Sequence, residues 1–296
     1  MQLADWTRLF AISLVWGSAF FLIEIALRDT GPLTLVTARL ALGAVVLLAY
    51  CAIAGIRTSL TPSLLAGVAF LGLFGNALPF SFIALGQTQI NSSLTAILIA
   101  TTPLFTVIVG HLWKREEPAT WSKFSGVLAG FCGVIILMNP TVLSSFKSGV
   151  AGQAAILGAA FSYAIAAVFG RRFRDIPAPA TAAGMLTTSS LIMIPFTLAF
   201  ETPFAMVPSP ATLAAIGVLG LLSTALAYIL YFTVLKNAGA TNAMLVTIVQ
   251  PPLAILLGVA FLGERLEPNQ LFGLGFILAG LLLVDGRIVR RATGRA

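Results

Sequence analysis

Two charged residues lie inside long apolar stretches of this sequence, where charge is rare. Glu24 falls seven residues before Gly31, and Arg39 falls eight residues after it. If Gly31 lies in the turn between two antiparallel helices, the two side chains sit at a similar depth. A lone charge in an apolar interior costs several kcal/mol, so the simplest interpretation is a buried ion pair. The alternatives are that Arg39 attracts a carboxylate or that Glu24 carries a proton.

Polar and aromatic residues also recur at a spacing of four along two apolar stretches. They are Asn76 and Phe80 in residues 64–87, and Thr224 and Tyr228 in residues 213–235. Residues four apart share one helix face. Each pair therefore predicts a face that lines a common central cavity and contacts a substrate. Ordinary packing, with the accompanying glycines allowing close helix approach, is the alternative.

Prolines interrupt two further stretches, each beside polar side chains. A proline inside a helix cannot donate a backbone hydrogen bond, so it frees a carbonyl one turn earlier. In a membrane that carbonyl needs a partner, a water or a ligand. The prolines are Pro103, Pro251 and Pro252, and the neighbouring polar residues are Thr95, Thr102, Thr247 and Gln250. These polar residues are candidates to bind a substrate amine or carboxylate, and a kink that only aids packing is the alternative.

A third group is aromatic and hydroxylated. It consists of Trp16 and Phe20 in residues 9–27, and of Ser162 and Tyr163 at the matching depth of residues 152–170. If these side chains line one wall of a cavity, that wall suits a partly apolar substrate. Helix packing is again the alternative, for Phe20 above all.

The elements that must position these residues are membrane helices. The chain has 296 residues, of which 58% are hydrophobic and only 9% charged, against about 25% charged in soluble domains. A helical span needs about 20 apolar residues. Ten stretches qualify, namely 9–27, 33–56, 64–87, 92–113, 121–138, 152–170, 178–200, 213–235, 241–263 and 269–284. We predict an all-α membrane protein with ten transmembrane helices, which makes the lipid bilayer one of its partners.

The basic residues are sorted between the two sides of these spans. Thirteen of the seventeen Lys and Arg fall on one side; Arg28, Lys147 and Arg265 fall on the other, and Arg39 lies within a span. Basic loops stay on the cytoplasmic side, so both termini are predicted to be cytoplasmic, in a bacterial inner membrane. The basic residues of these loops and of the C-terminal tail account for the net charge of +7. Nucleic acid is not expected as a partner, because no basic–aromatic motif is present.

The chain also repeats itself at offsets of 146 to 148 residues. Residues 1–139 and 152–285 are predicted to be two five-helix repeats, joined by a loop at 140–151 and followed by a basic cytoplasmic tail at 286–296. Five is an odd number, so the second repeat must enter the membrane with inverted topology. Inverted repeats are a recurring transporter design, with the substrate site between the repeats.

Several motifs resemble those of the drug/metabolite transporter superfamily, EamA type. They are Trp16-Gly17-Ser18-Ala19-Phe20, Ala38-Arg39-Leu40, the prolines midway along 92–113 and 241–263, and Gly263-Glu264-Arg265-Leu266-x-Pro268. The resemblance covers nearly the whole chain and implies ten helices in two inverted repeats that export small metabolites. Within the superfamily, the chain is similar to the amino-acid exporters of the YddG kind. It departs from the pattern at 114–117, where Lys-Arg-Glu-Glu lacks the glycine turn.

Enzyme classes find no support in the sequence. A single histidine cannot form a zincin pair, and there is no G-x-S-x-G elbow and no Walker or Rossmann loop. We therefore expect no enzyme activity, no cofactor and no metal. The sequence favours a secondary transporter that exports amino acids or related small metabolites by alternating access, with a monomer as the working expectation. The alternatives are a proton-coupled drug or cation antiporter that uses Glu24, and a non-transporting scaffold or scramblase.

Overall fold

The computed structural model describes residues 3–56, 61–114, 121–138, 149–173, 175–238 and 246–285, and no strand occurs among them. Seven of the described helical segments are long and apolar enough to cross a membrane: Leu3–Ala26, Pro32–Ile53, Pro62–Gln87, Ser92–Trp113, Val150–Phe173, Ala178–Phe200 and Pro210–Val234. Three shorter apolar helices accompany them, at Phe124–Ile136, Gln250–Leu262 and Pro268–Leu283. The predicted all-α membrane class is confirmed. The predicted number of ten spans exceeds the seven long segments found among the described residues.

In the first half, the helices are α1 (Leu3–Ala26), α2 (Pro32–Ile53), α3 (Pro62–Gly72), η1 (Leu73–Ala77), α4 (Leu78–Gln87), α5 (Ser92–Ile99), α6 (Thr102–Lys114) and α7 (Trp121–Met138). In the second half they are α9 (Val150–Gly170), η2 (Arg171–Phe173), α10 (Ala178–Phe200), η3 (Pro203–Ala205), α11 (Pro210–Gly220), η4 (Leu221–Leu226), α12 (Ala227–Ala238), α14 (Val246–Leu262) and α15 (Pro268–Asp285). Most of the predicted loop 140–151 and all of the predicted tail 286–296 lie outside the described residues.

Local sequence explains where several of these helices begin and end. Thr61, Asn91 and Ser209 are N-caps whose side chains accept a backbone N–H from the first turn. A proline follows two of these caps in the first turn, where its missing N–H costs nothing. Gly263, with φ of +68°, follows the end of α14, as expected for a residue that must adopt the left-handed conformation.

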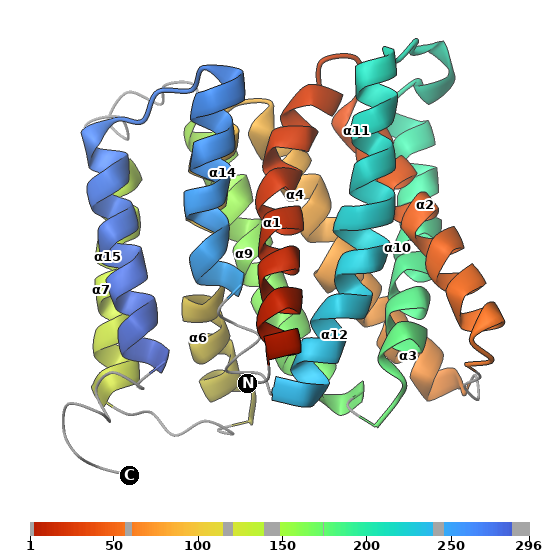
Figure 1. The fold of residues 1–296 in the computed structure, drawn as a ribbon, viewed down its shortest axis with the longest axis horizontal. Coiled ribbons are helices and arrows are strands. Elements are labelled where there is room, and N and C mark those ends of the chain that lie inside the picture. The colour runs from red at the N-terminus through yellow and green to blue at the C-terminus, as the bar shows by residue number, and fades with distance from the viewer. Residues whose placement is uncertain are drawn as a thin grey trace.

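The two halves run in opposite directions and interlock. Gln87, at the end of α4, donates a hydrogen bond to Glu24 near the end of α1, and the neighbouring Gln89 accepts one from Gly152 at the start of α9. The end of α1 and the start of α9 therefore lie at the same end of the bundle, so these helices are antiparallel. In addition, α1 packs against α11, η4 and α12, while α9 packs against α3, η1 and α4 (Figure 1). The first helix of each half thus contacts the third membrane segment of the other half, which is α11–η4–α12 or α3–η1–α4. This reciprocal contact is expected of inverted repeats.

The helices α7 and α15 lie side by side at one edge of the molecule (Figure 1). Their contact depends on glycine. A Cβ atom at Gly133 would lie 2.6 Å from the carbonyl oxygen of Gly273, and one at Gly280 would lie 2.5 Å from that of Gly126. Gly273 and Gly280 follow Gly126 and Gly133 by 147 residues, an offset of the internal repeat, which indicates that the duplication preserves a close helix contact.

Candidate functional site

The third segment of each half contains a π-helical turn at the equivalent place. The turns η1 and η4 begin at Leu73 and Leu221, which differ by the repeat offset of 148 residues. A π turn widens the helix and disturbs its regular hydrogen bonds, and such turns are frequent at functional sites. No sequence signal at these positions predicted them.

Each π turn receives a side-chain hydrogen bond from the first helix of the opposite half. Ser162 in α9 donates its hydroxyl to the carbonyl of Phe74 at 2.7 Å, and Trp16 in α1 donates its indole N–H to the carbonyl of Ser223 at 3.0 Å. Ser162 and Trp16 differ by 146 residues, so these two contacts are also related by the repeat. Two predicted site residues therefore hold the halves together at their π turns.

The predicted polar faces meet between these turns. Tyr228 donates its hydroxyl to Asn76 Oδ1 at 2.5 Å, and Arg39 Nε donates to Thr224 Oγ1 at 2.8 Å. The guanidinium of Arg39 also stacks on Phe80, with Cζ 4.0 Å from the ring centroid. Asn76 and Thr224 are fully buried. We call Arg39, Asn76, Phe80, Thr224 and Tyr228 the central polar cluster, and its residues come from both halves.

Aromatic rings surround the central polar cluster. Trp16 contacts Tyr228 edge-on at 6.5 Å between ring centroids and lies 5.4 Å from Tyr231. Tyr228 stacks on Phe232. Tyr163 packs against two clusters of buried apolar side chains, one that includes Phe20 and one that includes Phe80. The cluster therefore combines a cation, an amide and hydroxyl groups with apolar walls. Tyr231 was not among the predicted site residues, although it shares a helix face with Tyr228 at a spacing of three.

Three carboxylates cap helices of the opposite half at one end of the bundle. Glu201 accepts the backbone N–H groups of Leu33 and Thr34 at the start of α2, at 2.9 and 2.8 Å. Glu264 accepts the N–H and hydroxyl groups of Ser92 and Ser93 at the start of α5. These acids satisfy orphan donors and favour the positive end of the helix dipole.

In the third cap, the acid belongs to the first half and the capped helix to the second. Asp29, which follows α1, accepts the hydroxyls of Ser209 and Thr212 at the start of α11, at 2.5 and 2.7 Å. These hydrogen bonds, first from Ser209 and then from Thr212, lower the pKa of Asp29 below its ordinary value of 3.8. We call Asp29, Glu201 and Glu264 the carboxylate caps. They follow the ends of α1, α10 and α14, which lie at the end of the bundle opposite the start of α1 (Figure 1).

Comparison with known proteins decides the family. A model of the EamA-like transporter family matches the chain twice, over residues 7–139 and 150–285. The chain belongs to the EamA-like transporter family. It is 29% identical over 279 residues to an uncharacterized inner membrane transporter of Escherichia coli, YedA, covering 93% of this chain and 89% of YedA. It is 26% identical over 286 residues to an uncharacterized transporter of Bacillus subtilis, YoaV, covering 95% of this chain and 96% of YoaV.

A solved crystal structure has the same fold as this EamA-like chain. It matches with a TM-score of 0.68 at 19% identity, over 98% of this chain and the whole of the other. The family match and the transporter relatives confirm the predicted EamA-type resemblance, and with it the assignment to a family of transporters rather than enzymes. The likeness to amino-acid exporters of the YddG kind stays a prediction.

The EamA-type motifs now have structural roles. Gly17, in the first motif, lets α1 approach α14, because a Cβ atom there would lie 2.9 Å from the Leu253 side chain and 3.3 Å from the Gln250 carbonyl. Arg39, in the second motif, belongs to the central polar cluster. Glu264, in the last motif, is a carboxylate cap. The divergent segment 115–117 lies outside the described residues.

The predicted ion pair between Glu24 and Arg39 is wrong, since no ion pair joins them in the described part of the chain. Glu24 instead accepts a hydrogen bond from Gln87 in α4 at 3.3 Å, while Arg39 contacts η4 and Phe80. Counting residues from Gly31 predicted a common depth for the two side chains, but their contacts on α4, Gln87 and Phe80, are seven residues apart, or about 10 Å along the helix axis. Both side chains therefore contact α4, and Arg39 also contacts η4 of the opposite half.

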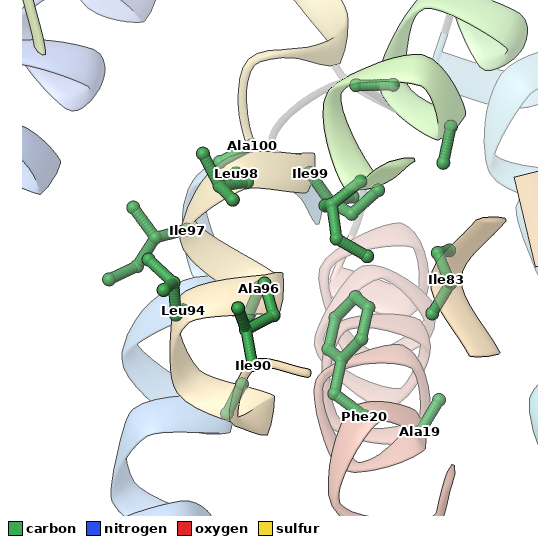
Figure 2. Close-up of a cluster of buried hydrophobic side chains, with 14 of the residues drawn as sticks. Ala19, Phe20, Ile83, Ile90, Leu94, Ala96, Ile97, Leu98, Ile99 and Ala100 are labelled. Carbon is green, nitrogen blue, oxygen red and sulfur yellow. The ribbon is translucent and has the colours of Figure 1, made fainter. Parts of the chain in front are cut away.

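Phe20 is a packing residue in this structure. Figure 2 shows its ring projecting from α1 among the apolar side chains of α5, including Ala96 and Ile99, with Ile83 of α4 nearby. Its backbone carbonyl accepts a hydrogen bond from Gln87 at 2.9 Å. The packing alternative therefore describes Phe20 better than a place in a substrate-facing wall.

The proline segments differ between the halves. The fourth segment breaks between α5 and α6, and Pro103 lies at the start of α6, whereas α14 continues through Pro251 and Pro252. Thr95 and Thr102 donate their hydroxyls to Asn91 and Ile99 within their own segment. Gln250 is buried in α14, and the side chain of Thr247 lies outside the described residues. No described contact brings these polar side chains into the central polar cluster.

The predicted central cavity stays a prediction: Asn76 and Thr224 have no exposed surface, whereas Trp16, Tyr163 and Tyr228 are partly exposed. A shallow apolar hollow of about 290 Å³ lies elsewhere, on α15, and is lined by Leu271, Phe272, Gly275, Phe276 and Ala279. Since it offers no polar side chain, it is unsuited to orient a polar solute.

Proposed function

We propose that this protein is a secondary transporter that exports amino acids or related small metabolites across the inner membrane by alternating access. The observation that carries the proposal is the pairing of two interlocked halves of a transporter family around a buried polar cluster. Residues 1–139 and 152–285 act as the two moving halves, joined by 140–151, with 286–296 as a tail. The small-molecule substrate binds among the central polar cluster and its aromatic neighbours.

Ten helices cross the membrane in this proposal. The shorter helices α7, α14 and α15 have 18, 17 and 18 residues. At 1.5 Å per residue they reach about 25–27 Å, close to the hydrocarbon thickness of about 30 Å. A small local thinning of the bilayer accommodates the difference.

Orientation follows from the positions of the charges. Arg8, Arg171 and Arg172 lie at the end of the bundle that holds the N-terminus, whereas Arg28 and Arg265 lie beside the carboxylate caps. The positive-inside rule then places both termini in the cytoplasm and the caps at the periplasmic face. The numerical excess comes from the full sequence, in which thirteen basic residues are predicted to lie on the same side of the membrane as the N-terminus.

The carboxylate caps suggest how access alternates. All three bridge the two halves at the same end, so opening that end must break these hydrogen bonds. The conformation described here is then the state closed to the periplasm. A solute drives the cycle only if it binds the two states differently, and the central polar cluster is where both halves touch it.

The decisive experiment is a solute screen in proteoliposomes that contain the purified full-length protein. Counterflow of labelled amino acids into vesicles preloaded with the same amino acid, absent from empty vesicles, is the expected result. Absence of flux for every amino acid and metabolite tested would favour the scaffold or scramblase alternative, which a lipid-flip assay in the same vesicles examines.

A pH gradient across these vesicles tests the antiporter alternative. Glu24 is half-buried, and its described side-chain hydrogen bond comes from the neutral Gln87, which leaves the carboxylate available to exchange a proton. If Glu24 couples transport to protons, Glu24→Gln abolishes acceleration by the gradient while leaving counterflow intact. If exchange is uncoupled, wild type and variant respond alike to the gradient.

A further inference from the structure

Arg39 is a buried cation without an anionic partner. The residue is only 6% exposed, yet the one hydrogen bond that its side chain makes within the described residues joins Nε to the neutral hydroxyl of Thr224. One face of the guanidinium is covered by Phe80. The terminal nitrogens have no hydrogen-bond acceptor among the described side chains, and no described carboxylate lies within ion-pair distance.

The groups around Arg39 cannot supply the missing charge. The nearby hydroxyl groups of Tyr163 and Tyr228 are phenols, which carry no charge at physiological pH. Glu24 accepts a hydrogen bond from Gln87, which lies seven residues, or about two helical turns, beyond Phe80 on α4. Burying an arginine without a counter-charge is costly in a membrane, and such residues usually mark an ion or substrate pathway.

A second donor in the same cluster also lacks an acceptor. Asn76 is fully buried, and its Oδ1 accepts the hydroxyl of Tyr228, but its Nδ2 has no hydrogen-bond partner. Asn76 and Phe80 share one helix face, and Phe80 carries the guanidinium of Arg39. The cluster therefore presents two sets of unused N–H donors from α2 and η1, and it needs an acceptor that carries negative charge.

We propose that Arg39 and Asn76 bind the carboxylate group of the transported solute. The planar guanidinium matches the two oxygens of a carboxylate, and the amide of Asn76 donates a further hydrogen bond. Trp16, Tyr228 and Phe232 surround the site and contact the apolar part of the solute. The inference rests on the proposed transport function and narrows its substrate class to carboxylates, such as amino acids and small organic acids.

Binding can be measured apart from transport. Thermal stability of the purified full-length protein is recorded with glycine, threonine, leucine, phenylalanine, acetate and 4-methylpentanoate, and with the amides of the four amino acids, at matched ionic strength. We expect stabilisation by a subset of the carboxylates and none by the corresponding amides. Arg39→Gln should weaken that binding about 10- to 150-fold, the equivalent of losing a hydrogen bond to a charged group worth about 1.5–3 kcal/mol.

Two further variants separate binding from folding. Arg39→Lys keeps the charge but loses the planar fork, so its affinity should fall between those of wild type and Arg39→Gln. Arg28→Gln removes one exposed positive charge near the end of α1 and should bind like wild type. Since Arg39 has no anionic partner to strand, Arg39→Gln should melt no lower than wild type without ligand.

The outcomes distinguish this inference from the proposed function. Equal stabilisation by acids and amides, unchanged carboxylate binding in Arg39→Gln, or no stabilisation of wild type by any carboxylate would each overturn the inference. Counterflow of a carboxylate-free solute would then leave the transporter proposal standing. Carboxylate binding that depends on Arg39 supports the inference even if no flux is found, in which case only the transport proposal fails.

Discussion

The cap formed by Glu264 gives a sharp test of how the two halves separate. Its Oε1 accepts the N–H and hydroxyl of Ser92 at 2.9 and 2.6 Å, and its Oε2 accepts the N–H of Ser93 at 3.0 Å together with the Ser93 hydroxyl. Both serines are fully buried. Glu264→Gln keeps one acceptor oxygen but replaces the other with an amide that cannot accept, and it removes the charge at the helix N-terminus.

The size of this perturbation follows from those contacts. A hydrogen bond to a charged group contributes about 1.5–3 kcal/mol, and an acid at a helix N-terminus adds about 0.3–1 kcal/mol. Glu264→Gln should therefore weaken the closed state by about 2–4 kcal/mol. This shifts the equilibrium toward the state open at that end by roughly 30- to 1000-fold.

The opening can be measured by labelling a cysteine at position 90, which is 9% exposed as Ile90 in this structure. The background carries Cys51→Ser and Cys132→Ser, and a membrane-impermeant maleimide is added from the cap side. Glu264→Gln should accelerate labelling by at least tenfold, whereas Glu267→Gln, which removes an exposed charge three residues away, should not. If Glu264→Gln lowers the melting temperature but leaves labelling unchanged, Glu264 stabilises the fold without controlling access.

Four further outcomes are expected. Tyr228→Phe removes the hydroxyl that Asn76 accepts and should reduce counterflow between a few-fold and 100-fold, for a loss of about 0.5–3 kcal/mol, in protein that remains inserted. Glu24→Gln and Arg39→Gln should have additive effects on thermal stability, because no ion pair joins them; coupling of 1 kcal/mol or more, about the lower range for residues in contact, would restore the pair. Gly133→Leu should lower the melting temperature by separating α7 from α15, since even a Cβ atom lies too close to a backbone oxygen there; an unchanged melting temperature would show that the helices adjust freely. Hydrogen bonds lower the pKa of Asp29 below 3.8, so its cap is fully formed above that pH and is lost as the pH falls through the lowered pKa. Wild type should therefore lose more thermal stability than Asp29→Asn over this acid range. Parallel curves of melting temperature against pH would mean that the cap contributes nothing.

The helices and the polar faces could be predicted because both depend on local periodicity. Asn76 and Phe80, like Thr224 and Tyr228, are four apart, and helical geometry alone places each pair on one face. The repeat offset then brings the two faces together, because equivalent residues meet between inverted halves. The structure bears this out in the hydrogen bond between Tyr228 and Asn76.

What sequence reasoning missed depends on tertiary contacts. Counting residues from Gly31 predicted one depth for Glu24 and Arg39, but packing sets how two helices align, and the contacts of these residues on α4 lie about two turns apart. The carboxylate caps join residues more than 160 positions apart, so only the fold shows that Glu201 caps the start of α2. The π turns likewise depend on packing between the halves, since the side chains that donate hydrogen bonds to their carbonyl groups come from α1 and α9.

Cross-linking the halves at the caps tests alternating access most directly. Asp29 and Ser209 contact each other across the two halves, so cysteines at both positions can be joined by a short, reducible methanethiosulfonate cross-linker in the cysteine-free background. With a solute that the screen identifies, the cross-linked protein should lose counterflow and regain it after reduction, while each single-cysteine variant stays active throughout. Full counterflow in quantitatively cross-linked protein would contradict the account, because the halves would then transport without separating at this end.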